Sequence, residues 1–186
     1  MRLFVAVYPS DQAIQEWMRF RQTAPSWPLR WTPAESLHIT LKFFGEVDPT
    51  VETKISGVLG KVAAGLSRLS LSMAGGGTFP SYRSPSTFWA ALMGDLVPLK
   101  EMAHVIELEL KTIVFQIEKR EFEPHVTLGR VADKHLRLSS AVSTDFKNWM
   151  AGFNSGSFEV NELALVQSRP GPIGSAYSIL RTFPLH

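Results

Sequence analysis

A short pattern, His-x-Thr-Leu, occurs twice in this chain and constrains its fold more than any other feature. The first copy is LHITLK at residues 37–42, and the second is PHVTLGR at residues 124–130. Each copy places a β-branched residue between His and Thr, which is typical of a strand. The copies lie nearly half the chain apart. We therefore expect two related lobes, each of which carries one copy on a strand.

The polar residues of each copy should point in one direction. Side chains in a strand alternate between its two faces. His38 and Thr40 therefore share one face, as do His125 and Thr127. The apolar residues between them can pack into a core, so the polar pairs are left to face something else.

Two cations stand beside these pairs and could balance a bound anion. Lys42 has the same parity as His38 and should share its face. Arg130 has the opposite parity to His125. It reaches the same face only if Gly129 forms a bulge or the strand ends there, and glycine permits either.

The rest of the chain alternates between strand-like and helix-like segments. The turn signals, and Asp48-Pro49 as a helix start, support these boundaries. We expect Gly75–Gly77 to break a strand, and 24–36 and 78–85 to be loops. The predicted fold class is α+β, with antiparallel sheets lining a central cleft and helices on the outside. Residues 1–186 should form one domain of two interleaved lobes. Strands are expected at 2–8, 36–47, 67–74, 87–93, 122–131, 157–167 and 176–183, and helices at 11–23, 51–66, 98–113 and 134–149.

Composition excludes several classes of protein. The chain has no cysteine, which rules out disulfide scaffolds, thiolate zinc sites and a cysteine nucleophile. A net charge of +2 with no basic run excludes a polycation that grips long nucleic acids by charge alone. No apolar run is long enough to span a membrane. We expect a monomeric, cytoplasmic protein.

Two histidines and two threonines suit phosphoryl chemistry. Histidine titrates near neutrality, so a pair can divide the acid and base roles, while threonine hydroxyls donate to anionic oxygens. Metal binding by His38 and His125 is the rival use. Neither motif contains a carboxylate or a second histidine at ligand spacing, so we expect no metal and no cofactor.

These segments resemble the two-histidine (2H) phosphoesterases, and in particular the LigT-like RNA 2′,3′-cyclic phosphodiesterase or 2′-5′ RNA ligase branch. The similarity extends from RLFVAVYP through both motif blocks to LVQSRPGPIGSAYSILRTFPL. The resemblance implies a bilobal, pseudo-symmetric fold. It also implies metal-free hydrolysis of RNA 2′,3′-cyclic phosphate ends to 2′-phosphomonoesters, and ATP-independent 2′-5′ joining as the reverse reaction.

The resemblance also assigns roles that spacing alone leaves open. It implies that His38 is the proton donor and His125 the proton acceptor, with Thr40 and Thr127 on the phosphate oxygens. Arg130 matches an arginine that follows the second motif in the family.

Phe79 and Tyr82, in the expected polar loop, are candidates for stacking on a base. The partner is expected to be an RNA end or a nucleotide cyclic phosphate. The alternatives are a 2H phosphodiesterase for other small cyclic phosphates or 2′-5′ oligonucleotides, and a non-catalytic module that binds RNA ends.

Overall fold

The computed structural model describes residues 1–113, 121–133, 135–171 and 174–186, which form an α+β fold with two antiparallel sheets. This confirms the predicted fold class. Sheet A has the order β3-β1-β8-β9, and sheet B has the order β2-β6-β5-β4-β7. The strands of sheet A are β3 (Ile39–Glu46), β1 (Arg2–Val7), β8 (Glu162–Gly171) and β9 (Gly174–Pro184). Those of sheet B are β2 (Leu29–Trp31), β6 (His125–Val131), β5 (Thr87–Gly94), β4 (Leu69–Phe79) and β7 (Asn154–Val160).

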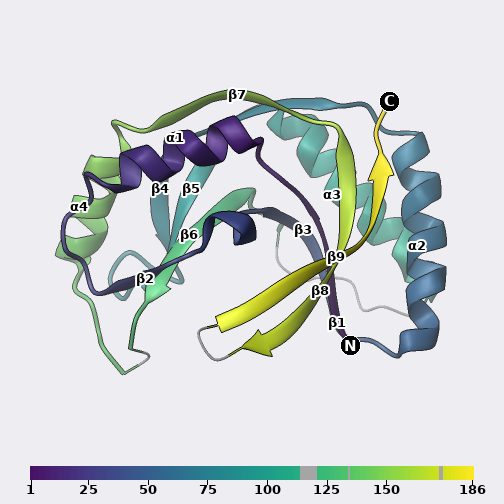
Figure 1. Cartoon of the computed structure of the whole chain (residues 1–186), viewed down its shortest axis with the longest axis horizontal. Coiled ribbons are helices and arrows are strands. Elements are labelled where there is room, and N and C mark those ends of the chain that lie inside the picture. Colours follow the sequence, from purple (N-terminus) through teal and green to yellow (C-terminus); the bar gives the residue numbers. More distant parts are fainter. Residues whose placement is uncertain (114–120, 134, 172–173) are drawn as a thin grey trace.

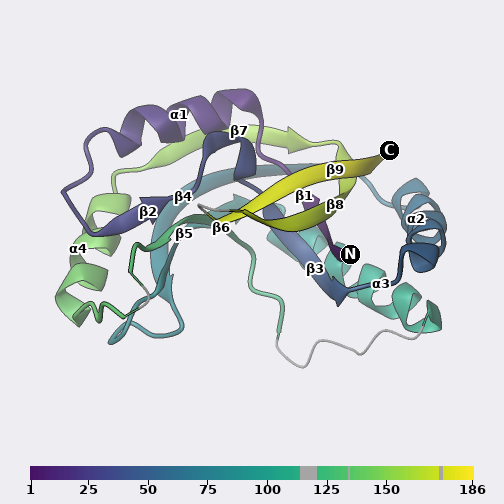
Figure 2. The ribbon, with the colours of Figure 1, turned by 60° about the horizontal axis from the view of Figure 1, so that its bottom comes forward.

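Four α-helices among the described residues cover the outer faces of the sheets (Figures 1 and 2). The first and last, α1 and α4, pack against β7 and β4 of sheet B. The other two, α2 and α3, pack against each other and against strands of sheet A. The helices are α1 (Asp11–Arg21), α2 (Pro49–Ala64), α3 (Leu96–Leu110) and α4 (Ser140–Met150).

Local signals explain where the first two helices begin. The Ser10 hydroxyl accepts a hydrogen bond from the backbone N–H of Ala13 at the start of α1. The Asp48 carboxylate accepts one from the N–H of Thr50 at the start of α2, and Pro49 follows in the first helical position. Both are N-caps that satisfy amide groups without a partner inside the helix.

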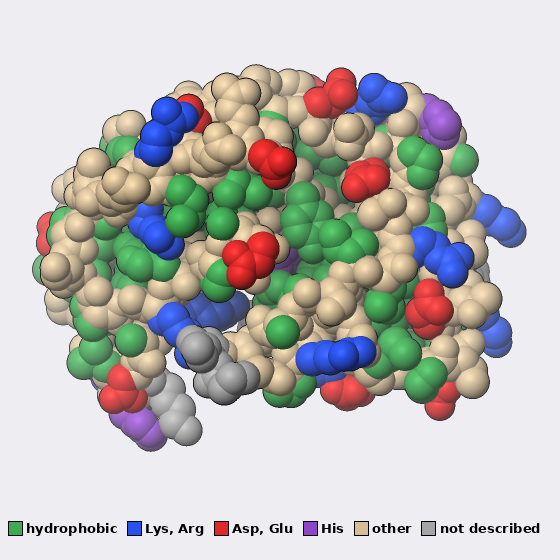
Figure 3. Space-filling view, viewed as in Figure 1, with side chains coloured by type: hydrophobic (Ala, Val, Ile, Leu, Met, Phe, Trp, Pro, Cys, Tyr) green, Lys and Arg blue, Asp and Glu red, His purple; other side chains and the backbone are tan. Residues whose placement is uncertain are grey.

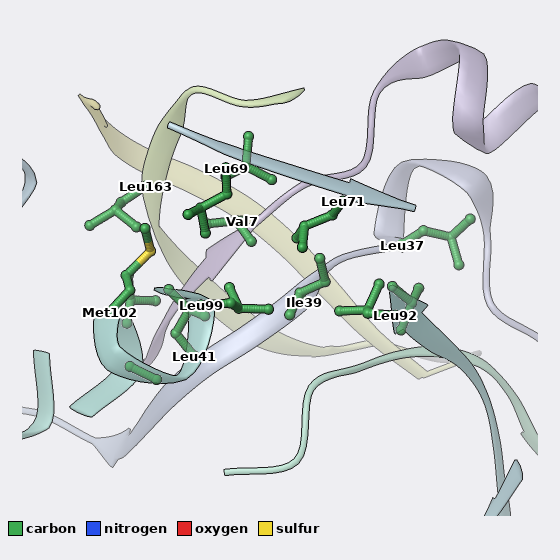
Figure 4. Close-up of a cluster of buried hydrophobic side chains, with 14 of the residues drawn as sticks. Val7, Leu37, Ile39, Leu41, Leu69, Leu71, Leu92, Leu99, Met102 and Leu163 are labelled. Carbon is green, nitrogen blue, oxygen red and sulfur yellow. The ribbon is translucent and has the colours of Figure 1, made fainter. Parts of the chain in front are cut away.

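The apolar residues of both motifs anchor their strands in one continuous core. Ile39, Val126 and Leu128 are fully buried, and Leu41 nearly so. Figure 4 shows Ile39 and Leu41 among leucines that come from other elements, including Leu99 of α3. The predicted division of each motif strand into a core face and a polar face is confirmed.

The expectation that Gly75–Gly77 breaks a strand was wrong, because β4 continues to Phe79. A Cβ built on Gly76 would lie 2.5 Å from the Trp89 carbonyl oxygen, and one built on Gly77 would lie 2.5 Å from its indole ring. The pairing of β4 with β5 is irregular between Met73 and Gly76. Gly76 and Gly77 therefore allow β4 and β5 to approach each other closely. In the sequence, glycines with this role look the same as glycines that form a turn.

The expected single strand at 157–167 is in fact two strands, β7 and β8, which belong to different sheets. Only Asn161 separates them, and the buried apolar residues change parity there, from Phe158 and Val160 in β7 to Leu163 and Leu165 in β8. The expected loop at 24–36 contains the short strand β2, and the helix expected from 134 begins at Ser140 as α4. Residue 134 itself lies outside the described residues.

Candidate functional site

The two motif strands, one from each sheet, contact each other. His38 lies just before β3, which is the edge strand of sheet A, and His125 begins β6 in sheet B. β3 and β6 contact each other. A cavity of about 1110 Å³ lies beside them, and its lining includes His38, Thr40, His125, Thr127 and Arg130. Figure 3 shows a hollow in the middle of one face, with a histidine side chain deep inside it.

Both imidazoles are held in the same way. The Nδ1 atom of His38 lies 2.7 Å from the carbonyl oxygen of Ser36, and that of His125 lies 2.7 Å from the carbonyl oxygen of Glu123. A carbonyl oxygen can only accept, so each Nδ1 carries the proton. Each Nε2 is thereby left to accept a proton when the ring is neutral, or to donate one when it is charged.

Burial disfavours the charged form of both rings. It lowers the pKa of His38, against the hydrogen bond to Ser36, and the nearby charge of His125 lowers that pKa further. Burial also lowers the pKa of His125. There the hydrogen bond and the charge of Glu123 act in the opposite direction, while the Arg130 guanidinium adds to the lowering. The two rings are thus close enough to influence each other's protonation.

A bulge brings Arg130 to the cavity, as the parity argument required. Trp89 pairs with Thr127 and the next residue, Phe88, pairs with Gly129, so Leu128 has no partner on β5. The extra residue reverses the alternation after it. Arg130 lines the cavity with His125, and its Nη1 donates a 2.8 Å hydrogen bond to the Thr87 hydroxyl.

The first motif carries a matching bulge, and the sequence did not reveal it. Ala6 pairs with Thr40 and Val5 with Lys42, so Leu41 is the extra residue. The expectation that Lys42 shares the face of His38 was therefore wrong. The Lys42 ammonium is buried 2.5 Å from the Glu107 carboxylate of α3, at the wall of the cavity. Its phosphate-binding role stays a prediction.

Phe43 takes the place on the His38 side that parity had given to Lys42. Its side chain is 65% exposed, and its ring packs against Phe4, which in turn lies 4.9 Å from the His38 ring. Tyr177 of β9 meets both Phe4 and His38 edge-on. Aligning the two motif copies pairs Phe43 with Arg130, and that pairing was the signal that could have identified Phe43.

The two aromatic candidates from the sequence lie in different surroundings. Phe79 lines the cavity, meets the His125 ring edge-on at 5.1 Å and stacks on Trp89. The hydroxyl of Tyr82 hydrogen bonds to Thr144 of α4, and Tyr82 is not among the cavity-lining residues. The structure brings Phe79, but not Tyr82, to the two histidines.

Two kinds of feature are absent from the described part of the chain. It contains no group of three or more His, Cys, Asp or Glu side chains arranged to hold a metal ion. It also contains no helix with the length and apolar character needed to cross a membrane.

Known proteins resemble this chain in sequence and in structure. The 2′-5′ RNA ligase superfamily matches residues 9–172. A curated relative from Archaeoglobus fulgidus, named RNA 2′,3′-cyclic phosphodiesterase, is 31% identical over 98% of this chain and 99% of its own. One of the same name from Aeropyrum pernix is 34% identical over 78% of this chain and 82% of its own.

Solved structures agree on the fold. TT0787 of Thermus thermophilus superposes with a TM-score of 0.78 at 20% identity, covering 100% of this chain and 98% of its own. LigT of E. coli in complex with 3′-AMP gives a TM-score of 0.77 at 24% identity, covering 99% and 97%. The match to most of the chain and the identity to full-length relatives show that this protein belongs to the 2′-5′ RNA ligase superfamily.

Proposed function

We propose that this protein is an RNA 2′,3′-cyclic phosphodiesterase that opens the terminal cyclic phosphate to a 2′-phosphomonoester. One observation carries the proposal: two histidines, each with Nδ1 bonded to a backbone carbonyl, line one cavity together with two threonines. Several relatives that match most of this chain carry that enzyme name, which supports the choice of reaction.

The proposed reaction is an in-line displacement at phosphorus. His125 Nε2 takes a proton from water as the water oxygen bonds to phosphorus. The bond from phosphorus to the 3′ oxygen breaks, and His38 Nε2 donates its proton to that oxygen. The hydroxyls of Thr40 and Thr127 donate to the non-bridging oxygens, whose charge grows in the transition state. Arg130 adds a positive charge on the His125 side.

The lowered pKa values of the two histidines favour the role of general base but not that of general acid. A general base must be neutral, and burial keeps His125 neutral down to lower pH. A general acid must be charged, which burial disfavours at His38. The anionic substrate compensates for this, because a negative charge beside an imidazolium raises its pKa. We therefore expect substrate binding to shift His38 towards its charged, protonated form.

The nucleoside would lie against the aromatic side chains at the cavity. Base–aromatic stacking tolerates any base, which suits an enzyme that acts on RNA ends. Phe79 is the candidate on the His125 side, and Phe43 with Tyr177 on the His38 side. Tyr82 stays a weaker candidate because its hydroxyl is bonded to α4. Joining of 2′-5′ ends would be the reverse reaction in the same site.

The direct test is to incubate the protein with an RNA that ends in a 2′,3′-cyclic phosphate and to identify the product by phosphorus NMR. We expect a 2′-phosphomonoester, formed equally well in EDTA. His38→Ala and His125→Ala should each lower turnover by about 10²–10⁴-fold. His135→Ala, an exposed histidine outside the cavity lining, is the matched control.

Other outcomes would contradict the proposal. A 3′-phosphomonoester would reverse the leaving group, and loss of activity in EDTA that added metal restores would contradict metal-free chemistry. Tight binding of the cyclic end without hydrolysis at any pH would favour a non-catalytic binding module. A monomeric state in the cytoplasm stays a prediction, and light scattering after size exclusion tests the first part.

A further inference from the structure

Two arginines lie directly opposite each other beside the catalytic cavity. Arg30 of β2 pairs with Arg130 of β6 in antiparallel register, and Arg130 pairs with Thr87 on its other side. Residues directly opposite in such a pair point to the same face of the sheet. The row Thr87–Arg130–Arg30 therefore runs across three strands on one face of sheet B.

That face is the cavity face. Thr87 and Arg130 line the cavity, and so does Thr32, which shares the face of Arg30 because it lies two residues further along the chain. The flanking Leu29 and Trp31 pack against the core instead. Arg30 therefore lies on the cavity face of sheet B, beside the residues that line the cavity, although it does not line the cavity itself.

The Arg30 guanidinium also reaches across to sheet A. A Cβ built on Gly174, the first residue of β9, would lie 3.9 Å from an Nη atom of Arg30. The side chain is exposed and stands where the β8–β9 hairpin approaches β2. Lys and Arg side chains gather beside the hollow on this side of the molecule (Figure 3).

This pairing of like charges lacks a partner of opposite charge among the described residues. Like charges directly opposite in a sheet destabilise it. Within the described ranges, the ion pairs of the protein include neither Arg30 nor Arg130, and Arg130 donates to a neutral hydroxyl. An anion is what such a pair lacks. The cyclic phosphate proposed to bind between the two histidines would be one anion, close to Arg130, and Arg30 extends the positive charge outward from that position.

We infer that Arg30 binds the RNA phosphodiester immediately upstream of the terminal nucleotide, so that the site recognises an RNA chain rather than a lone nucleoside cyclic phosphate. This inference rests on the proposed RNA-end substrate. An RNA chain that ends in the cavity carries its next phosphate one nucleotide away, and the row of cationic side chains leads from the cavity to the rim. Arg30 is thus a substrate-binding residue for the chain and takes no part in the bond-breaking step.

The test measures binding of two probes that cannot react: an RNA tetranucleotide ending in a 2′-phosphate, and a nucleoside 2′-monophosphate. Arg30→Met should weaken tetranucleotide binding by about fivefold, the effect of one exposed charge contact. It should also make the log–log dependence of affinity on salt less steep by about 0.7, as expected when one single-strand phosphate contact is lost. The loss should be confined to the tetranucleotide, and Arg30→Lys should retain most of the salt dependence.

Arg68→Met is the matched control, because Arg68 is an exposed arginine that pairs with Glu159 and does not line the cavity. It should leave both the affinity and the salt dependence for the tetranucleotide unchanged. Equal weakening of both probes by Arg30→Met, or no change for either, would overturn the inference. Because binding is measured without turnover, failure to hydrolyse a cyclic end would refute the proposed function separately.

Discussion

The buried ion pair between Lys42 and Glu107 should be a strong stability determinant. The ammonium and carboxylate are 2.5 Å apart, and the two side chains are 5% and 15% exposed. Breaking a buried pair is strongly destabilising, and we expect Lys42→Met to cost about 3 kcal/mol, the low end of the usual range because Glu107 keeps some contact with solvent. With a urea m-value of about 2 kcal/mol/M, the unfolding midpoint should fall by about 1.5 M.

A double-mutant cycle in urea tests this reasoning. Glu107→Gln should also destabilise, because it leaves Lys42 buried and charged. The double variant should be more stable than the sum of the single effects predicts, with a coupling of about 2 kcal/mol. A coupling near zero, or a Lys42→Met midpoint within experimental error of the original, would refute the argument.

The same double variant separates the two roles considered for Lys42. If Lys42 serves only the ion pair, the double variant should hydrolyse a cyclic phosphate end at a rate close to that of the original protein. If Lys42 also binds the phosphate, activity should fall by an order of magnitude or more even though the protein folds. The sequence alone made Lys42 a candidate phosphate ligand without favouring that role over a solvated strand position, and the bulge at Leu41 is the structural reason to test the ion-pair role.

Three further predictions concern the site and its support. Gly77→Ala should destabilise by about 1–3 kcal/mol in urea and lower kcat, because its Cβ would clash with the Trp89 ring, which contacts His125; unchanged stability would contradict the close-approach explanation. Because the folded protein holds His38 and His125 at a lowered pKa, the unfolded chain binds more protons below the ordinary value of 6.5, so stability should fall as the pH drops through and below this region; in the His38→Ala/His125→Ala variant that part of the slope, followed by thermal unfolding, should disappear. Phe43→Ala should raise KM for a nucleoside cyclic phosphate more than for ribose 2′,3′-cyclic phosphate, which has no base to stack; an equal rise for both would argue against stacking.

The sequence predicted the parts of the fold that depend on local alternation and on helix signals. Ile39, Leu41, Val126 and Leu128 gave the core face of the motif strands, and Asp48-Pro49 gave the start of α2. Where the chain changes sheets, at Asn161, the buried apolar residues change parity, and the prediction of a single strand overlooked this signal. Where a glycine allows two strands to approach closely, as at Gly76, the sequence alone wrongly suggests a turn.

The site could be predicted in its pairs of residues, but only one of its two bulges could be anticipated. The repeated motif indicated that His38 and His125 converge, and parity showed that Arg130 needs an irregular strand. The matching bulge at Leu41 depends on how β3 pairs with β1, which no local pattern encodes. For the same reason the sequence placed Lys42 where the structure places Phe43.

The most direct test of paired acid and base catalysis is the pH dependence of kcat/KM in the original protein and in the two single histidine variants. The original should give a bell-shaped profile whose acidic limb reports the base His125 and whose alkaline limb reports the acid His38. The residual activity of His125→Ala should lack the acidic limb, and that of His38→Ala the alkaline limb. A flat profile between pH 5 and 9, or two variants that keep both limbs, would contradict the assignment of one proton transfer to each ring.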